Sequence, residues 1–123
     1  MPWVRVVLYC EASGVVPFLD WFRSLPSDVQ DKCRVRIERL AEQGHLLRRP
    51  EADYLRDGIH ELRARHKRVR YRILYFFHGR ETAVISHGFS KSGRKVPDVE
   101  VRRAAVRSRA YRMKPEAHTY EER

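Results

Sequence analysis

The sequence predicts an α+β protein: an N-terminal strand and a helical hairpin packed on a twisted antiparallel sheet of about four strands, followed by a C-terminal helix. Three observations predict this fold. Two stretches with helical spacing of apolar residues precede position 44, three runs of β-forming residues lie between 58 and 89, and another helical pattern follows Pro97. At 123 residues, the length favours a single domain over 1–123.

The chain opens with a short β-forming run. Residues 3–9, WVRVVLY, predict the first strand. The stretch 15–25 predicts a short helix, because Phe18, Phe22 and Leu25 recur at helical spacing. These aromatic side chains are typical of a core-facing stripe rather than of a surface that stacks on nucleic-acid bases.

The second helix completes a hairpin over about 15–43. Ser27 and Gln30 match the capping-box pattern, in which the first hydroxyl and a later amide satisfy the free N–H groups of a helix start. Gly44 is typical of the position just beyond a helix end. Basic and acidic residues alternate on the outer side of this helix, which indicates a solvated face.

The predicted sheet follows an acidic connector over 45–57. Residues 58–66, 69–77 and 82–89 are three β-forming runs separated by short turns, so they predict an antiparallel meander. We expect the first strand to join the edge of this meander.

The chain is expected to end with a helix and a tail. Asp98 follows Pro97 and begins a helical pattern over about 98–112. Residues 115–123 form a mixed, mostly acidic tail.

Composition indicates a cytoplasmic protein. The apolar runs are shorter than a membrane-spanning helix requires, and the N-terminal run is too short for a secretion signal. Cys10 and Cys33 are two cysteines without a metal-binding spacing, as expected of reduced thiols in the cytoplasm. We therefore expect no membrane association.

Positive charge is concentrated in one half of the chain. The formal net charge is +10. Residues 58–115 contain 16 Lys or Arg and four Asp or Glu, a balance of +12, whereas the rest of the chain has a balance of −2. This segregation favours an anionic partner, either nucleic acid or an acidic protein segment, over a generally basic surface that serves solubility.

Strand alternation places many of these cations together. Side chains alternate between the two faces of a strand, so the arginines of the first two meander strands share one face while the apolar residues face the helical hairpin. Three cations in the loop after the last strand would lie at the rim of this groove, and arginines of the C-terminal helix could extend it. The strand residues are Arg63, Arg65, Arg70 and Arg72; the rim residues are Lys91, Arg94 and Lys95; the helix residues include Arg102 and Arg103.

Two interpretations of this cluster stay open. Like charges at close range repel, and a bound anion would relieve the repulsion. Alternatively, acidic neighbours neutralise the cluster; the candidates are Glu51, Asp53, Asp57 and Glu61.

The residue inventory favours chemistry without a metal or another cofactor. The chain has none of the common metal or nucleotide-phosphate motifs, and the spacing of its histidines matches no familiar metal site. RNA can be cut without a metal, because its 2′-OH attacks the adjacent phosphate while protein groups move protons and stabilise charge.

His87 and Lys91 are candidates for proton transfer. Candidates for holding phosphate are Arg63, Arg65, Arg72 and Arg94. Nucleic-acid binding without cleavage fits the same composition.

An ordered set of motifs resembles a known family. The chain reads YLRDGIHELR, then YRILYFF, then HGFSKSGRKVP followed by a helix, over about residues 55–112. This order is similar to that of the HigB-like, phage-derived branch of the RelE/ParE toxin superfamily, found in type II toxin–antitoxin operons. The resemblance implies a RelE-like fold.

The resemblance also implies an activity and partners. Family members are endoribonucleases that cleave mRNA, often on the translating ribosome, and so inhibit translation. The implied partners are mRNA, the ribosome and a cognate antitoxin, typically a helix-turn-helix protein through which the toxin meets operator DNA only indirectly. Two alternatives stay open: a ParE-like gyrase inhibitor of the same fold, and a plain RNA-binding module.

Carried over by position, the resemblance assigns functional roles to four cations. Arg63 of ELR, Arg72 of YRI, and Lys91 and Lys95 of the last motif match the family's basic functional positions. Ser92 departs from the pattern, because many relatives have a second lysine there. His87 receives no role from the resemblance.

Overall fold

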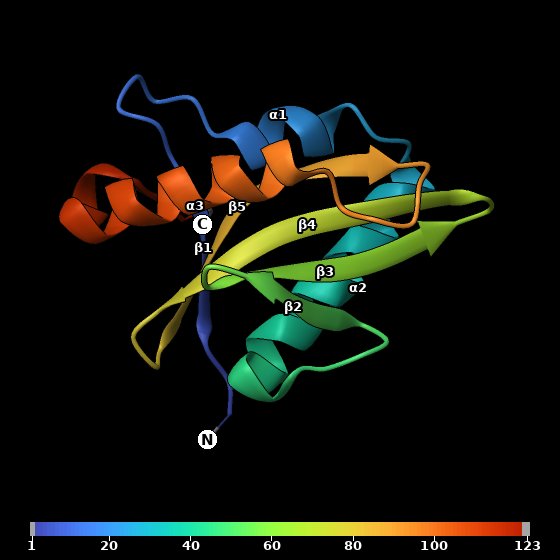
Figure 1. Cartoon of the computed structure of the whole chain (residues 1–123), viewed down its shortest axis with the longest axis horizontal. Helices are drawn as coiled ribbons and strands as arrows, with labels where there is room; N and C mark the ends of the chain where they lie inside the picture. Colours follow the sequence, from blue (N-terminus) through green and yellow to red (C-terminus); the bar gives the residue numbers. More distant parts are fainter. Residues whose placement is uncertain (1, 122–123) are drawn as a thin grey trace.

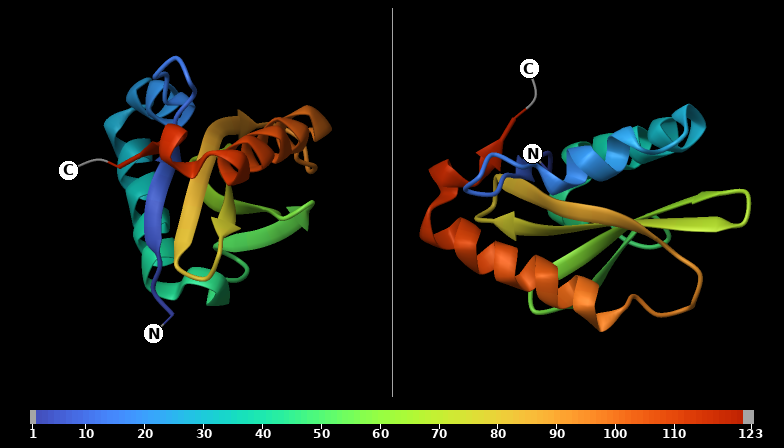
Figure 2. Two further views of the ribbon diagram at one scale, coloured as in Figure 1. Left: turned by 90° about the vertical axis from the view of Figure 1, so that its left-hand side faces the viewer. Right: turned by 90° about the horizontal axis from the view of Figure 1, so that it is seen from above.

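The computed structural model describes residues 2–121 and shows one mixed six-stranded sheet with helices on both faces (Figures 1 and 2). The strands are β1 (Arg5–Tyr9), β2 (Ala52–Arg56), β3 (Ile59–His66), β4 (Val69–His78), β5 (Thr82–Lys91) and β6 (Thr119–Tyr120). The α-helices are α1 (Pro17–Arg23), α2 (Ser27–Gln43) and α3 (Asp98–Met113), and two short 3₁₀-helices are η1 (Gly44–Leu46) and η2 (Pro115–Ala117).

The α+β fold class and the central meander are confirmed. The strand order is β2-β3-β4-β5-β1-β6, and every neighbouring pair is antiparallel except β1 and β5. The first strand joins the meander beside β5, as expected, and it does so in parallel.

Two strands lie where the sequence predicted none. β2 occupies residues 52–56, inside the predicted connector, and turns into β3 at Asp57 and Gly58, which both have positive φ. An Asp-Gly pair is a strong hairpin-turn signal. The strand before this pair was not predicted, because the charged residues of β2 are more typical of a loop. β6 adds two residues of the predicted tail to the edge of β1.

The helical hairpin differs in detail from its prediction. α1 has seven residues, rather than spanning 15–25. The capping-box prediction is wrong: Pro26 is the residue before α2, and no side chain caps its N-terminus. Gln30 instead donates a hydrogen bond from Nε2 to the carbonyl oxygen of Phe22 at 2.9 Å, which ties α2 to α1.

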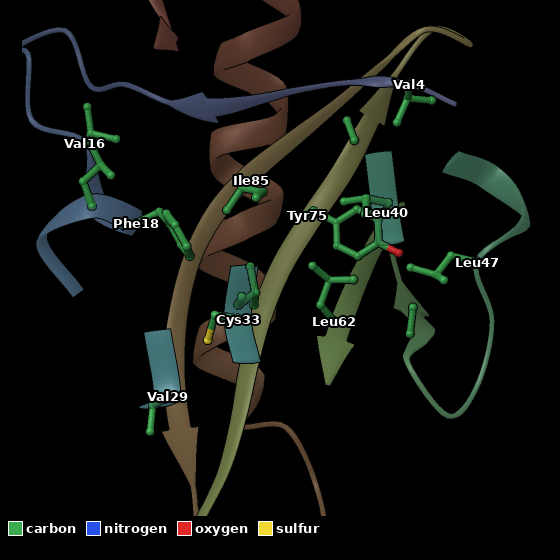
Figure 3. Close-up of a cluster of buried hydrophobic side chains, with 14 residues drawn as sticks. Val4, Val16, Phe18, Val29, Cys33, Leu40, Leu47, Leu62, Tyr75 and Ile85 are labelled. Carbon is green, nitrogen blue, oxygen red and sulfur yellow. The ribbon is translucent and has the colours of Figure 1, made fainter. Parts of the chain in front are cut away.

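The sheet has an apolar core on each face. The hairpin covers one face, where Cys33 and Leu40 of α2 pack among strand residues such as Tyr75 and Ile85 (Figure 3). On the other face, Leu74 of β4 belongs to a second cluster that includes residues of α3. The cationic groove predicted on this face is therefore confined to the end of the sheet beyond this cluster, because α3 covers the part that carries Leu74 and Phe76.

A glycine of β5 allows α1 to approach the sheet closely. A Cβ atom added at Gly88 would lie 2.2 Å from Cζ3 of the Trp21 ring. No side chain other than hydrogen fits there unless the indole moves. Packing thus explains the glycine of the HGF motif. The absence of a side chain at Gly88 lets α1 pack directly against the strand that leads to the candidate site.

We predict that Gly88→Ala lowers the free energy of unfolding by roughly 1–3 kcal/mol, the usual cost of overpacking a core. Chemical denaturation measures this change. Gly93→Ala is the matched control, because an added Cβ there meets nothing within 4 Å. In a Trp21→Ala background the cost of Gly88→Ala should largely disappear; an undiminished cost would contradict the packing explanation.

Candidate active site

The strand register brings the predicted arginines onto one face. Arg63 lies opposite Arg72, and Arg65 lies opposite Arg70, across the β3–β4 pair. Lys91, at the end of β5, lies opposite Arg70 on its other side. Directly opposed residues of an antiparallel pair share a face, so five cations from three strands are neighbours.

A buried carboxylate holds two of these arginines. Glu61 is 2% exposed and accepts a hydrogen bond from Arg63 Nε at 2.9 Å. Arg72 Nε lies 3.1 Å from Glu61 Oε1, as an ion pair whose angle falls short of a hydrogen bond. Glu61 therefore supplies the counter-charge that lets Arg63 and Arg72 occupy adjacent strands.

Arg72 is enclosed by this arrangement. It is 8% exposed, and its Nη1 donates a hydrogen bond to the carbonyl oxygen of Tyr71 at 3.0 Å. Burial lowers the pKa of the guanidinium, and Glu61 opposes that shift. Arg72 is thus a fixed positive charge behind the surface.

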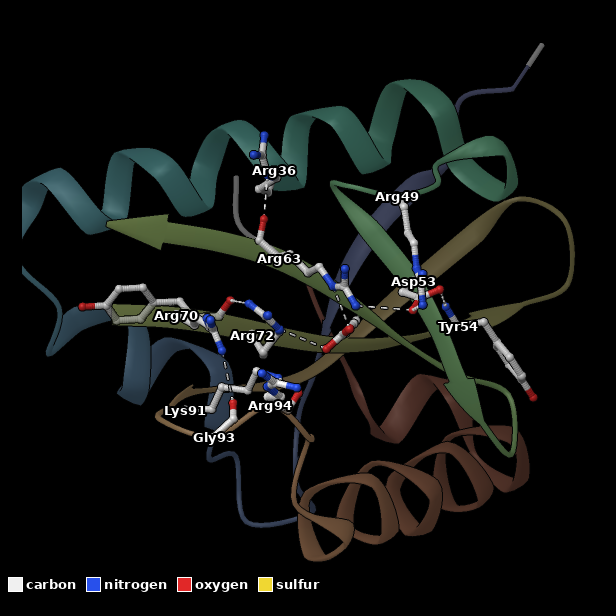
Figure 4. Close-up of polar contacts among 12 residues, drawn as sticks. Arg36, Arg49, Asp53, Tyr54, Arg63, Arg70, Arg72, Lys91, Gly93 and Arg94 are labelled. Atoms are coloured by element: carbon white, nitrogen blue, oxygen red, sulfur yellow. Dashed lines mark hydrogen bonds and ion pairs between the residues drawn. The ribbon is translucent and has the colours of Figure 1, made fainter. Parts of the chain in front are cut away.

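Four of the predicted cations line one pocket. Its volume is about 320 Å³, and its walls come from β2, β3, the end of β5, the following loop and the start of α3. Figure 4 shows Lys91 and Arg94 on the α3 side of Arg72. The four predicted cations in its lining are Arg63, Lys91, Arg94 and Lys95.

Lys91 has the electrostatic surroundings of a potential base. Its Nζ donates a hydrogen bond to the carbonyl oxygen of Arg94. Burial lowers the pKa of Lys91, and the charges of Arg72, Arg70 and Arg63 lower it further, against an opposing effect of Glu61. A lowered pKa increases the fraction of neutral amine, which can accept a proton.

The acidic residues neutralise only part of the cluster. Asp53 Oδ2 accepts hydrogen bonds from Arg49 at 2.8 Å and from Arg63 at 3.4 Å. Glu51 pairs with arginines of α2, and Asp57 with Arg56. In the described part of the chain, five cations at the front of the cluster make no ion pair with a carboxylate: Arg65, Arg70, Lys91, Arg94 and Lys95.

His87 lies outside the pocket. The register between β4 and β5 shifts at this point, so Ser86 and His87 both contact α3 side chains. Ser86 Oγ lies 2.8 Å from His87 Nδ1, and His87 Nε2 lies 3.0 Å from Glu100 Oε1. Burial lowers the pKa of His87 to about 4. His87 is therefore a neutral link between β5 and α3, roughly 13 Å along the strand from Lys91.

Arg102 and Arg103 are also separated from the pocket. Both are exposed on α3, where Arg102 pairs with Asp98 at 3.2 Å and Arg103 with Glu100 at 2.6 Å. They line a different hollow, between α3 and the segment after β1. The structure thus divides the predicted binding residues into two surfaces.

Sequence reasoning missed the central place of Glu61. It appeared only among possible neutralising acids. The available signal was alternation, since Glu61 shares a strand face with Arg63 and Arg65. Glu61 also lies within a β-forming run, between His60 and Leu62, and an acidic side chain is almost never fully buried unless it is paired.

Residues 2–121 contain no group of three or more His, Cys, Asp or Glu side chains placed to hold a metal ion. None of their helices has the length and apolar character needed to cross a membrane.

The order of strands and helices is that of a known class of protein. An N-terminal strand, a helical hairpin, a mostly antiparallel sheet and a C-terminal helix match the topology expected of RelE-superfamily toxins. A family model agrees: residues 20–109 match the family described as phage derived protein Gp49-like (DUF891). The chain belongs to this Gp49-like family, a HigB-like toxin family of the RelE superfamily. No curated protein matches the chain.

We predict that Glu61→Gln destabilises the fold by about 3–5 kcal/mol, because the Arg72 charge would stay buried without its counter-ion. Thermal or chemical unfolding measures the loss. The double variant Glu61→Leu with Arg72→Met should be considerably more stable than Glu61→Gln, since it removes both charges. A Glu61→Gln variant as stable as the parent would contradict the role of Glu61 as buried counter-ion.

Proposed function

We propose that this protein is the toxin of a type II toxin–antitoxin system and cleaves mRNA as a metal-independent endoribonuclease on the translating ribosome. Its partners would be mRNA, the ribosome and a cognate helix-turn-helix antitoxin that contacts operator DNA. Membership of a HigB-like toxin family supports the class. The observation that carries the chemistry is a pocket in which Lys91, with a lowered pKa, lies with Arg94 and Lys95, which lack carboxylate partners, and with Arg63, which Glu61 and Asp53 hold.

The proposed reaction uses the nucleophile of RNA itself. The neutral amine of Lys91 takes the proton from a 2′-OH, whose oxygen then attacks the adjacent phosphorus. The P–O5′ bond breaks, and the leaving oxygen is protonated by a cationic acid or by water. The products are a 2′,3′-cyclic phosphate and a 5′-hydroxyl end.

The arginines supply the electrostatic part of catalysis. Two negative oxygens of the phosphorane need donors placed before the reaction, and Arg63, Arg94 and Lys95 line the same pocket as Lys91. Arg72 acts from behind, because its buried charge lowers the pKa of Lys91. Arg65 and Arg70 extend the positive surface along the strands, where a single-stranded RNA backbone would lie.

His87 enters this proposal as a support residue. Its ring is buried between Ser86 and Glu100 and does not line the pocket. It therefore positions β5 against α3 and takes no proton from RNA.

We predict that Lys91→Ala lowers mRNA cleavage by roughly 100-fold or more, the usual contribution of a general base. The measurement is mapping of mRNA ends after induced expression, together with translation rate. Lys114→Ala is the control for total charge, because Lys114 is exposed beyond α3 and away from the pocket. A folded Lys91→Ala variant that cleaves normally would overturn the assignment of Lys91.

Expression and RNA-binding assays of the parent protein distinguish the alternatives. Intact mRNA with a DNA-damage response would indicate a gyrase inhibitor. Salt-sensitive RNA binding without cleavage, on ribosomes as well as in isolation, would indicate a binding module.

We predict that the cleavage rate rises with pH as Lys91 loses its proton. Arg70→Gln removes a positive charge that lowers the pKa of Lys91, so the rising limb should move to higher pH. Arg65→Gln is the matched control, because Arg65 lies one strand farther from Lys91 than Arg70 does. A limb that does not move in Arg70→Gln would show that another group is titrating.

A further inference from the structure

The outer face of α3 carries an apolar stripe where a solvated helix would present polar residues. Val99, Val106 and Met113 are spaced by seven residues, and therefore lie on one side of the helix. Their side chains are 48%, 56% and 84% exposed. The opposite side of α3 contains Val101, Ala104 and Tyr111, which pack into the second core. The stripe is thus not part of the core.

Arginines border this stripe on both sides. An α-helix turns about 100° per residue, which places Arg103 and Arg107 on one flank of the stripe and Arg102 and Arg109 on the other. Arg109 makes no ion pair within residues 2–121. Arg102 and Arg103 pair with Asp98 and Glu100 of α3, and Arg107 pairs with Glu11. With five arginines and two acids, α3 keeps an excess of positive charge, which is carried by Arg109 and Arg112.

A hollow adjoins the stripe. It has a volume of about 420 Å³ and lies between α3 and the segment that leaves β1. Val99 and Val106 belong to its lining, as does Tyr9, whose ring lies 5.7 Å from the guanidinium carbon of Arg107. Apolar side chains of a partner could therefore be received beside the stripe.

We propose that the outer face of α3 is a docking surface for an acidic amphipathic helix of a partner protein. Apolar residues of that helix would cover Val99, Val106 and Met113, and its carboxylates would meet the flanking arginines. An apolar stripe has no favourable contact to offer a phosphate backbone, so the combination fits an acidic helix better than RNA. The surface is separate from the Lys91 pocket, and this proposal does not depend on RNA cleavage. Under the proposed function, the antitoxin is the first protein in which to seek such a helix.

The probe is a synthetic helical peptide of about three heptads, with leucine at the a and d positions and glutamate beside them. Fluorescence anisotropy measures its affinity for the full chain at physiological salt. We expect it to bind at least about tenfold more tightly than a scrambled peptide of the same composition, which carries the same charge without the stripe.

Variants locate the binding site. Val106→Asp should weaken binding at least about tenfold, because it places a carboxylate in the apolar contact and opposite acidic residues. Val35→Asp is the matched control, since Val35 is 49% exposed on α2, away from α3. Arg109→Glu should also weaken binding.

Three results would overturn the proposal. The first is that the scrambled peptide binds as tightly as the helical peptide. The second is that Val106→Asp binds the helical peptide as tightly as the parent. The third is that single-stranded RNA displaces the peptide and binds Val106→Asp with the same affinity as the parent. The last would assign the arginines of α3 to RNA. Because mRNA cleavage by the same variants is measured separately, failure of the docking surface is distinguishable from failure of the proposed activity.

Discussion

The contact between Glu61 and the two arginines with which it pairs, Arg63 and Arg72, organises the candidate site. Three adjacent strands carry cations on one face, and at close range these charges repel. The buried carboxylate offsets this repulsion for Arg63 and Arg72, whereas the outer cations have no carboxylate partner in the described part of the chain. The same contact explains why Lys91, next in line, has a lowered pKa although an acid is near: burial and three positive charges together outweigh the single carboxylate.

One face of the sheet carries only core contacts, whereas the other carries both a second core and the candidate site. The helical hairpin covers one face completely enough to form a core, whereas α3 covers only part of the other and leaves the end with the cations open. Gly88 and His87, neighbours in one motif, secure β5 to α1 and α3 respectively. The motif HGF thus positions the strand that ends in Lys91.

Alternation and turn signals were sufficient to predict the meander and the facing arginines, and the helical pattern after Pro97 was sufficient to predict α3. They were insufficient for β2, whose charged residues resemble a loop and whose pairing depends on β3, a neighbour in space. Ser27 and Gln30 have the residue types of a capping box, but Pro26 occupies the N-cap position and Gln30 bonds to the carbonyl oxygen of Phe22 instead. The division of the basic residues between two surfaces depends on how α3 packs, and local sequence does not specify that.

The partial exposure of Lys91 has a practical consequence. Glu61 and Arg72 are buried and support one another, so replacing either endangers the fold, whereas the Lys91 ammonium group is held by a single hydrogen bond at the edge of the pocket. A chain silenced at Lys91 would keep its surfaces, including the outer face of α3, without the proposed activity that prevents growth. Such a chain could be produced alone in cells and used as bait to isolate the proteins that bind it.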